Sequence, residues 1–264
     1  MAEIDLYDIY QGQIAAFLLV LTRTSGIFLI SPFFGSMNVP MQLRAATAIV
    51  FAVIIFPVIV KTSIVTAPES LWIFAATVAK EMFVGWLIGF TAYVSFAAIS
   101  MSGKIMDMQI GFAVANVMDP TSGQQMPLIG SFLHNLAVIY LVVVNGHHFI
   151  ISGLVESFRV VPLDTFMWNE NLTTLAGDLT ASVLMIGMKI AMPVTFAILM
   201  TNVGLGILAR TMPQMNIFVI GIPLQLTIGT ATLAMLMPFY VLFLDTLFNT
   251  MYGNISTLIK TITG

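Results

Sequence analysis

The chain has 264 residues, of which 59% are hydrophobic and 8% charged, and its formal net charge is −3. Soluble domains carry roughly 25% charged residues, so this composition excludes a soluble domain and predicts an integral membrane protein. The small net charge gives no reason to expect nucleic-acid binding. Because the chain has no cysteine, disulfides and thiolate metal sites are excluded as well.

Six segments are apolar over about the 20 residues that a helix needs to cross a bilayer core, which predicts an all-α fold. They cover residues 14–34, 43–60, 71–101, 128–155, 179–209 and 217–247. The last four exceed one crossing, and Pro193, Pro223 and Pro238 fall inside the fifth and sixth. We therefore expect long, kinked helical segments that form hairpins.

Charged side chains lie inside several of these segments, where each costs about 2.5–3.5 kcal/mol on insertion scales and faces protein or water. They are Arg23, Lys80, Glu81, Lys189 and Asp245. The adjacent Lys80 and Glu81 form either a proton or ion relay or, as we favour, part of a buried structural pair or a polar hinge. Neighbouring helical residues point about 100° apart, so these two need not pair with each other.

A GxxxG pattern, Gly85 to Gly89, lies in the third segment. Such a pattern lets another helix approach closely, but it also arises by chance in apolar helices. The sequence leaves both interpretations open.

The stretch of residues 103–127 is too polar and broken for a spanning helix and too apolar for an ordinary exposed loop. Irregular backbone at membrane depth is tolerated only where protein buries it or where it lines a cavity. We therefore expect a non-helical central loop at a conduction path or its closure. Its methionines either form an adaptable seal or are ordinary apolar filler. The candidate gating residues are Met106, Met108, Gly111, Phe112, Met118, Asp119, Pro120, Gly123 and Met126.

Residues 145–148, Asn-Gly-His-His, interrupt the fourth segment. Zinc-binding helices place their ligands at i and i+4, whereas adjacent histidines diverge, so we expect a kink at Asn145 and Gly146 and no metal site. The chain also lacks the common nucleotide-binding, metalloprotease and serine-hydrolase motifs. We therefore expect neither an enzyme nor a cofactor.

Motifs along most of the chain resemble one family, the R subunits of type III secretion export gates (FliR/SctT). They are Arg23, Ser31-Pro32, Val39-Pro40, Arg44, Gly111-Phe112, Met118-Asp119-Pro120, Met126-Pro127 and Asn145-Gly146-His147. The most specific match is the run PQMNIFVIGIP, residues 213–223, with Gly229 after it. Within this run, Asn216, Gly221 and Pro223 are the expected structural positions.

The resemblance implies a division of the chain into two parts. Residues 1–155 are similar to the gate's P subunit and residues 179–264 to its Q subunit. The hydrophilic stretch of residues 156–178 is the expected linker between them.

The resemblance also implies partners and a role. One R subunit assembles with several P-type and Q-type subunits into a helical cone around a pore, much of it above the bilayer plane. The B-type switch subunit and the basal-body ring are further expected partners in the bacterial inner membrane. Residues 111–127 would be a plug in the pore, and the cargo would be unfolded flagellar proteins.

Two other functions remain open. One is a polytopic small-solute transporter, in which the central stretch is a re-entrant loop at the substrate site. The other is the homologous T subunit of a virulence injectisome, although the Asp-Pro loop and the PQMNIFVIGIP run favour the flagellar branch.

Overall fold

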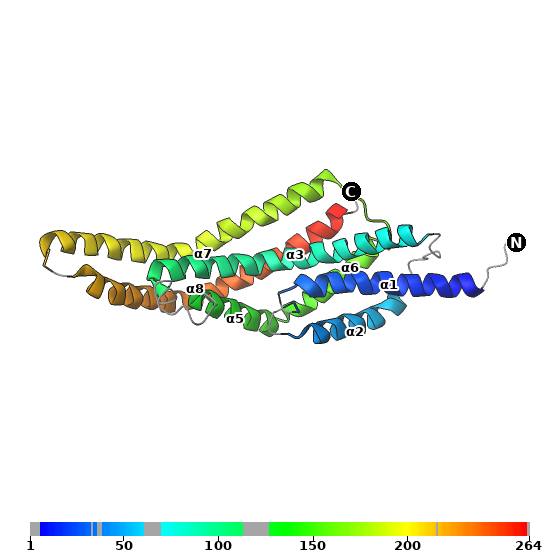
Figure 1. Cartoon of the computed structure of the whole chain (residues 1–264), viewed down its shortest axis with the longest axis horizontal. Helices are drawn as coiled ribbons and strands as arrows, with labels where there is room; N and C mark the ends of the chain where they lie inside the picture. The colour runs from blue at the N-terminus through cyan, green and yellow to red at the C-terminus, as the bar shows by residue number, and fades with distance from the viewer. Residues whose placement is uncertain are drawn as a thin grey trace. The chain divides into compact units, whose positions relative to one another are not determined.

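The computed structural model describes residues 6–32, 34–35, 39–60, 70–112, 127–214 and 216–262. These residues form long helices and no strand (Figure 1). The helices are α1 (Leu6–Ile30), α2 (Met41–Ile59), α3 (Leu71–Ile110), α5 (Leu128–Val143), α6 (Gly146–Val160), α7 (Glu170–Thr211) and α8 (Ile217–Ile262). The predicted all-α fold is confirmed.

Five of the helices are long and apolar enough to cross a membrane by length and composition, or up to six if α5 and α6 together count as one bent span. This agrees with the six apolar segments expected from the sequence. The proline residues do not break the last two segments. Pro193 lies inside α7, which has 42 residues, while Pro223 and Pro238 lie inside α8, which has 46.

The central loop begins later than the sequence predicted, because α3 continues through residues 103–110. Lys104, Met106, Met108 and Gln109 are good helix formers, and the next glycine after Gly103 is Gly111. The helix ends at Ile110, and the next residue, Gly111, has a φ of +97° and donates its N–H to the carbonyl of Asp107 at 3.2 Å. A glycine in this conformation is a common helix C-cap.

The expected polar linker is also mostly helical. The last turn of α6 ends at Val160 and α7 begins at Glu170, so the connection between them is residues 161–169. Residues 170–178 can form the start of α7 although they are hydrophilic, because they hold only one glycine and no proline.

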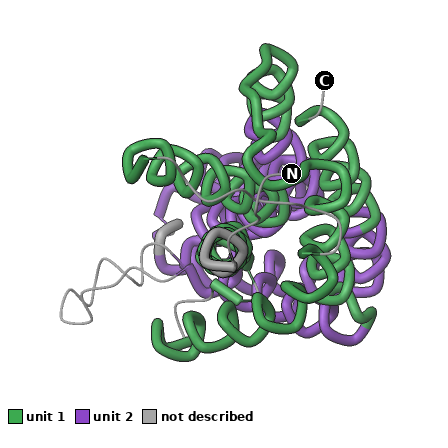
Figure 2. Tube along the Cα trace, turned by 90° about the vertical axis from the view of Figure 1, so that its right-hand side faces the viewer, with its two compact units in different colours: residues 1–93, 144–179, 249–264 green, residues 94–143, 180–248 purple. Residues whose placement is uncertain are grey.

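The chain forms two compact units, shown in different colours in Figure 2. The first comprises Met1–Tyr93, Val144–Leu179 and Asn249–Gly264, and the second Val94–Val143 and Thr180–Phe248. This division differs from the one at residues 156–178, which rests on the resemblance to two subunits and stays a prediction.

In the first unit, α1 crosses the first part of α3 with the two backbones in contact. A Cβ atom at Gly26 would lie 2.6 Å from the carbonyl oxygen of Met82, and one at Gly85 would overlap the carbonyl oxygen of Arg23. A Cβ atom at Gly89 would lie 3.1 Å from the carbonyl oxygen of Ile27. The GxxxG pattern of α3 therefore lies at this crossing, and small residues are what allow the helices to approach so closely.

In the second unit, the last part of α3 packs against α5, α7 and α8. Phe96 of α3 stacks on Phe248 of α8, with ring centroids 5.5 Å apart. The hydroxyl of Tyr240 in α8 donates to the carbonyl of Leu133 in α5 at 3.1 Å. A Cβ atom at Gly187 of α7 would lie 3.2 Å from the carbonyl oxygen of Ala98. These contacts join α3, α5, α7 and α8 within the second unit.

Candidate functional site

The two ends of the central loop are joined by a buried carboxylate. Asp107, near the end of α3, is 4% exposed. Its carboxylate accepts hydrogen bonds from the backbone N–H groups of Ile129 at 3.0 Å and Gly130 at 3.2 Å, in the first turn of α5. First-turn N–H groups have no acceptor inside their own helix, and a carboxylate both satisfies them and complements the helix dipole. Asp107 therefore stabilises α5 and ties its start to α3.

Next to this carboxylate the two helices touch through glycine. A Cβ atom at Gly103 would overlap the Cα atom of Gly130. At Gly130, a Cβ atom would lie 3.1 Å from Cγ of Pro127. We call Gly103, Asp107, Ile129 and Gly130 the loop base. The loop base therefore joins the end of α3 to the start of α5 within the second unit.

The start of the loop also contacts α8. A Cβ atom at Gly229 would lie 2.5 Å from Cγ1 of Ile110, so glycine is needed where the end of α3 meets α8. Gln225, one turn earlier on α8, donates its side-chain N–H to the side-chain oxygen of Asn202 on α7. A Cβ atom at Gly111 would lie 3.8 Å from Oε1 of the same Gln225. The root of the loop thus rests on the α7–α8 hairpin.

The predicted gating residues divide into three groups. Met106 and Met108 lie in α3 and not in the expected loop, with Met106 2% exposed and Met108 73% exposed, and their gating role stays a prediction. Gly111 and the half-buried Phe112 lie where α3 ends. Met118, Asp119, Pro120, Gly123 and Met126 lie outside the described residues.

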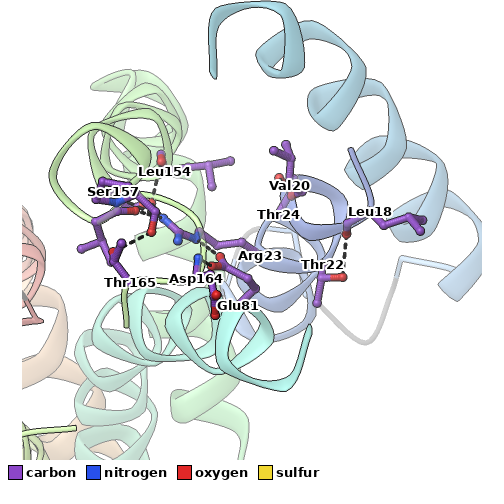
Figure 3. Close-up of polar contacts among 12 residues, drawn as sticks. Leu18, Val20, Thr22, Arg23, Thr24, Glu81, Leu154, Ser157, Asp164 and Thr165 are labelled. Atoms are coloured by element: carbon purple, nitrogen blue, oxygen red, sulfur yellow. Dashed lines mark hydrogen bonds and ion pairs between the residues drawn. The ribbon is translucent and has the colours of Figure 1, made fainter. Parts of the chain in front are cut away.

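A second polar site lies in the first unit, around Arg23 (Figure 3). Nε of Arg23 donates to Oε2 of Glu81 at 2.6 Å, and both side chains are 0% exposed. Nη1 of Arg23 donates to the carbonyl oxygens of Ser157 at 3.0 Å and Val161 at 2.9 Å. The guanidinium carbon lies 4.4 Å from the centre of the Phe158 ring, an attractive cation–π geometry. One buried arginine thus connects α1 with α3 and α6.

Glu81 and Lys80 both reach the connection that follows α6. Oε1 of Glu81 accepts a hydrogen bond from the backbone N–H of Asp164 at 3.0 Å, and Thr77 donates to the Asp164 carboxylate at 3.0 Å. Nζ of Lys80 lies 3.6 Å from the same carboxylate, in an exposed ion pair. Asp164 has a φ of +64°, a conformation that costs energy for a residue other than glycine and that these contacts hold in place. Glu81 therefore pairs with Arg23, not with its neighbour Lys80.

The break in the fourth apolar segment lies at Asn145, where a kink was expected. Asn145 has a φ of +55°, and the helices α5 and α6 on either side of it are bent by 71°. The rings of His147 and His148 lie edge to face, 4.3 Å apart. Among the described residues, no group of three or more acidic or histidine side chains is arranged to hold a metal ion.

The motif run of residues 213–223, before and within α8, has local structural roles. The carbonyl of Asn216 accepts a hydrogen bond from the N–H of Val219 at 3.2 Å, so Asn216 starts α8. Gly221 is buried and Pro223 is exposed, and both lie inside the helix.

Sequence reasoning missed Asp107, Ser157 and Asp164. The partners of Asp107 are 22 and 23 residues away, and hydropathy carries no signal for such a pairing. Asp164 follows Pro162 and Leu163, a turn-forming context that could have marked it as a special backbone position.

These features define a polytopic α-helical membrane protein in which the loop base joins α3 to α5 and an ion pair is buried between α1 and α3. The sequence pattern of "Bacterial export proteins, family 1" matches residues 14–251. The chain belongs to this family, which confirms the resemblance found in its motifs.

Individual relatives support the assignment over most of the chain. The flagellar biosynthetic protein FliR of Bacillus subtilis (strain 168) is 36% identical over 217 residues, which are 81% of this chain and 83% of the relative. FliR of Escherichia coli (strain K12) is 30% identical over 244 residues, 91% of each chain. FliR of Aquifex aeolicus (strain VF5) is 30% identical over 213 residues, 78% of this chain and 79% of the relative.

Proposed function

We propose that this chain is a component of a flagellar type III protein export gate. With P-type and Q-type subunits it would form the pore through which unfolded flagellar proteins leave the cell, and its central loop would plug the closed pore. The membership in an export-protein family and the flagellar names of the similar proteins support this proposal. The setting would be the inner membrane at the flagellar basal body, with the B-type switch subunit as a further partner.

The structure of the loop base is the main support for the proposed plug. A plug has to remain attached at its root while its tip moves aside for a passing chain. The hydrogen bonds from Ile129 and Gly130 to Asp107 and the glycine contact between α3 and α5 supply such a root. A plug held at such a root would be able to move without separating the helices that carry it.

The exposed surface of the α7–α8 hairpin is further support for contact with other subunits or with lipid. Many large apolar side chains of both helices are exposed in the isolated chain, among them Phe196, Val219 and Phe239. An exposed apolar surface of this extent marks a site of contact with protein or membrane.

The test is a deletion within the loop that keeps its root. Removing residues 113–123 leaves the C-cap Gly111, Pro127 and the four residues of the loop base in place. In cells that express the assembled gate, we expect this variant to admit ions or a small dye that the unaltered gate excludes. The matched control replaces the same residues with a Gly/Ser segment of equal length, which keeps the chain length but removes the apolar side chains. An unchanged leak rate in an assembled gate with the deletion would contradict the plug.

A polytopic small-solute transporter is the second candidate, and the bend at Asn145 favours it. Transporters build substrate sites from discontinuous helices near the bilayer midplane, and α5 and α6 form a discontinuous pair bent by 71°. Native mass spectrometry of the chain co-expressed with candidate P-type and Q-type subunits separates the two functions. A gate component forms a hetero-complex, whereas a transporter purifies as a monodisperse monomer or symmetric oligomer.

A further inference from the structure

The α7–α8 hairpin carries a band of exposed apolar side chains of bilayer dimensions. On α7 the large exposed apolar residues run from Leu184 to Leu208, and on α8 from Val219 to Leu242. At about 1.5 Å per residue, each run is roughly 35 Å long, close to the ~30 Å of a hydrocarbon core. We call these two runs the apolar band.

One charged residue, Lys189, lies inside this band. Its side chain is exposed, and among the described residues no acidic side chain lies within ion-pair distance of it. Lys189 is five residues from Leu184, the end of the band, or about 7.5 Å along the helix. The Cα–Cβ bond of a helical residue tilts toward the helix N-terminus, so the stem of Lys189 leads toward that end. A lysine placed in this way can bring its ammonium group to the level of the lipid headgroups.

Lys189 also lines a cavity of about 180 Å³ in the second unit. The other lining residues are Met106, Leu133, Ile190, Pro193, Leu233, Leu236, Met237, Phe239, Tyr240 and Phe243. All but Tyr240 are apolar, and the hydroxyl of Tyr240 is already hydrogen-bonded to the carbonyl of Leu133 at 3.1 Å. The cavity therefore combines apolar walls with a single cation.

We propose that this cavity is a binding site for one phospholipid with an anionic headgroup. An acyl chain would occupy the apolar cavity, and the phosphate would accept hydrogen bonds from the ammonium group of Lys189. Two features favour an amphiphile over an acidic side chain of another subunit. The cation lies at the edge of a bilayer-sized band, and the apolar space beside it would stay empty if only a carboxylate approached. This proposal goes beyond the gate function, and it requires that lipid reaches this face of the α7–α8 hairpin in the assembled protein.

The acidic residue of α8 is Asp245, and no ion pair between it and Lys189 is present among the described residues. Asp245 lies beyond the end of the apolar band and accepts a hydrogen bond from the hydroxyl of Tyr140 at 3.3 Å. A zwitterionic headgroup adds a cation that Lys189 repels, whereas a phosphatidylglycerol headgroup does not. We therefore expect a preference for the anionic lipid.

The test is a lipid titration of the full chain, purified in detergent together with its co-expressed subunits. Native mass spectrometry would follow the retention of phosphatidylglycerol and phosphatidylcholine added at equal concentrations. We expect several-fold tighter retention of phosphatidylglycerol, loss of this preference in Lys189→Gln, and its survival in Lys189→Arg. Excess inorganic phosphate should not displace the lipid, since the acyl chain contributes to binding.

Two further variants make the test specific. Lys104→Gln removes an exposed lysine of α3 in the same unit that does not line the cavity, and it should leave the preference unchanged. Leu236→Trp fills the cavity and should weaken retention of both lipids, with the subunit composition in the same spectrum as the check on folding. Equal retention of the two lipids by the unaltered chain, or an unchanged preference in Lys189→Gln, would overturn the proposal. A carbodiimide cross-link from Lys189 to a carboxylate of another subunit would do so as well.

Discussion

Gly103 and Gly130 touch through their backbones, because a Cβ atom added to Gly103 would overlap the Cα atom of Gly130. The contact brings the end of α3 against the start of α5, where the Asp107 carboxylate accepts two backbone hydrogen bonds. The loop base is thus held by steric fit and by polar contacts at once, and the two contributions can be tested separately.

The steric contribution predicts a large effect of a single methyl group. In Gly103→Ala the helices have to separate, and inserting a methylene into a tightly packed site costs about 1–3 kcal/mol. We expect lower thermal stability of the purified complex and an increased leak through the assembled gate. Gly204→Ala is the matched control in the same unit, because nothing lies within 4 Å of a Cβ atom there. The control should be neutral or stabilising by up to about 1 kcal/mol, as expected for Gly to Ala in a helix. Equal effects of the two substitutions would contradict the close contact.

The polar contribution predicts a graded series at Asp107. Asp107→Ala leaves two buried N–H groups of α5 without an acceptor, and loss of a helix cap costs about 0.5–2 kcal/mol. Asp107→Asn keeps an acceptor oxygen and should cost less. Amide hydrogen exchange in the first turn of α5 should report the order, with the fastest exchange in the alanine variant. Indistinguishable exchange in all three proteins would show that the cap does not hold the helix.

The buried pair of Arg23 and Glu81 predicts strong coupling. Removing one partner leaves the other charge buried and unpaired, which costs about 3–5 kcal/mol. Arg23→Met and Glu81→Met should therefore each destabilise the first unit strongly, and the double variant should cost less than the sum. Thermal unfolding of the four proteins completes the double-mutant cycle. Lys80→Ala, which removes the exposed partner of Asp164, should change stability by at most about 1 kcal/mol. Additive effects of the two buried substitutions would contradict the ion pair.

The positive φ of Asn145 predicts that glycine is more stabilising than alanine at this position. Its φ of +55° is easy for glycine and costs an ordinary L-residue about 1–2 kcal/mol. Asn145→Gly should keep or raise stability, whereas Asn145→Ala should lower it by about 1 kcal/mol. The melting temperatures of the two variants would check this, and a more stable alanine variant would show that the bend does not depend on this residue.

Hydropathy was sufficient to predict the all-α fold and the apolar segments, because long apolar runs leave a membrane chain few alternatives to helix. It failed at the end of α3, where the charged and polar side chains of Lys104, Asp107 and Gln109 suggested a loop. The helix propensities of Lys104 and Gln109, and the absence of a glycine between Gly103 and Gly111, would have predicted the observed end. At this position, helix propensity and the position of glycine predict the helix end better than average polarity does.

The polar contacts could not be predicted in the same way. Arg23 and Glu81 are 58 residues apart, and a single sequence contains no information that pairs them. The GxxxG pattern was visible, but its partner Gly26 on α1 was not, since the pattern describes only one side of a helix crossing. The motif run of residues 213–223, in contrast, was long enough to identify the family.

The partners of Arg23 impose an order on the synthesis of this protein. Glu81 follows it by 58 residues, and the carbonyl groups of Ser157 and Val161 follow by 134 and 138. Until those residues leave the ribosome, the guanidinium of α1 has no protein acceptor, and a lone charge in the bilayer is costly. We therefore expect the first helix to reach its final depth only after α6 has been made. Labelling a single cysteine introduced beside Arg23, in nascent chains arrested at increasing lengths, would show when that happens. The first helix to be translated would then be among the last to reach its final position in the membrane.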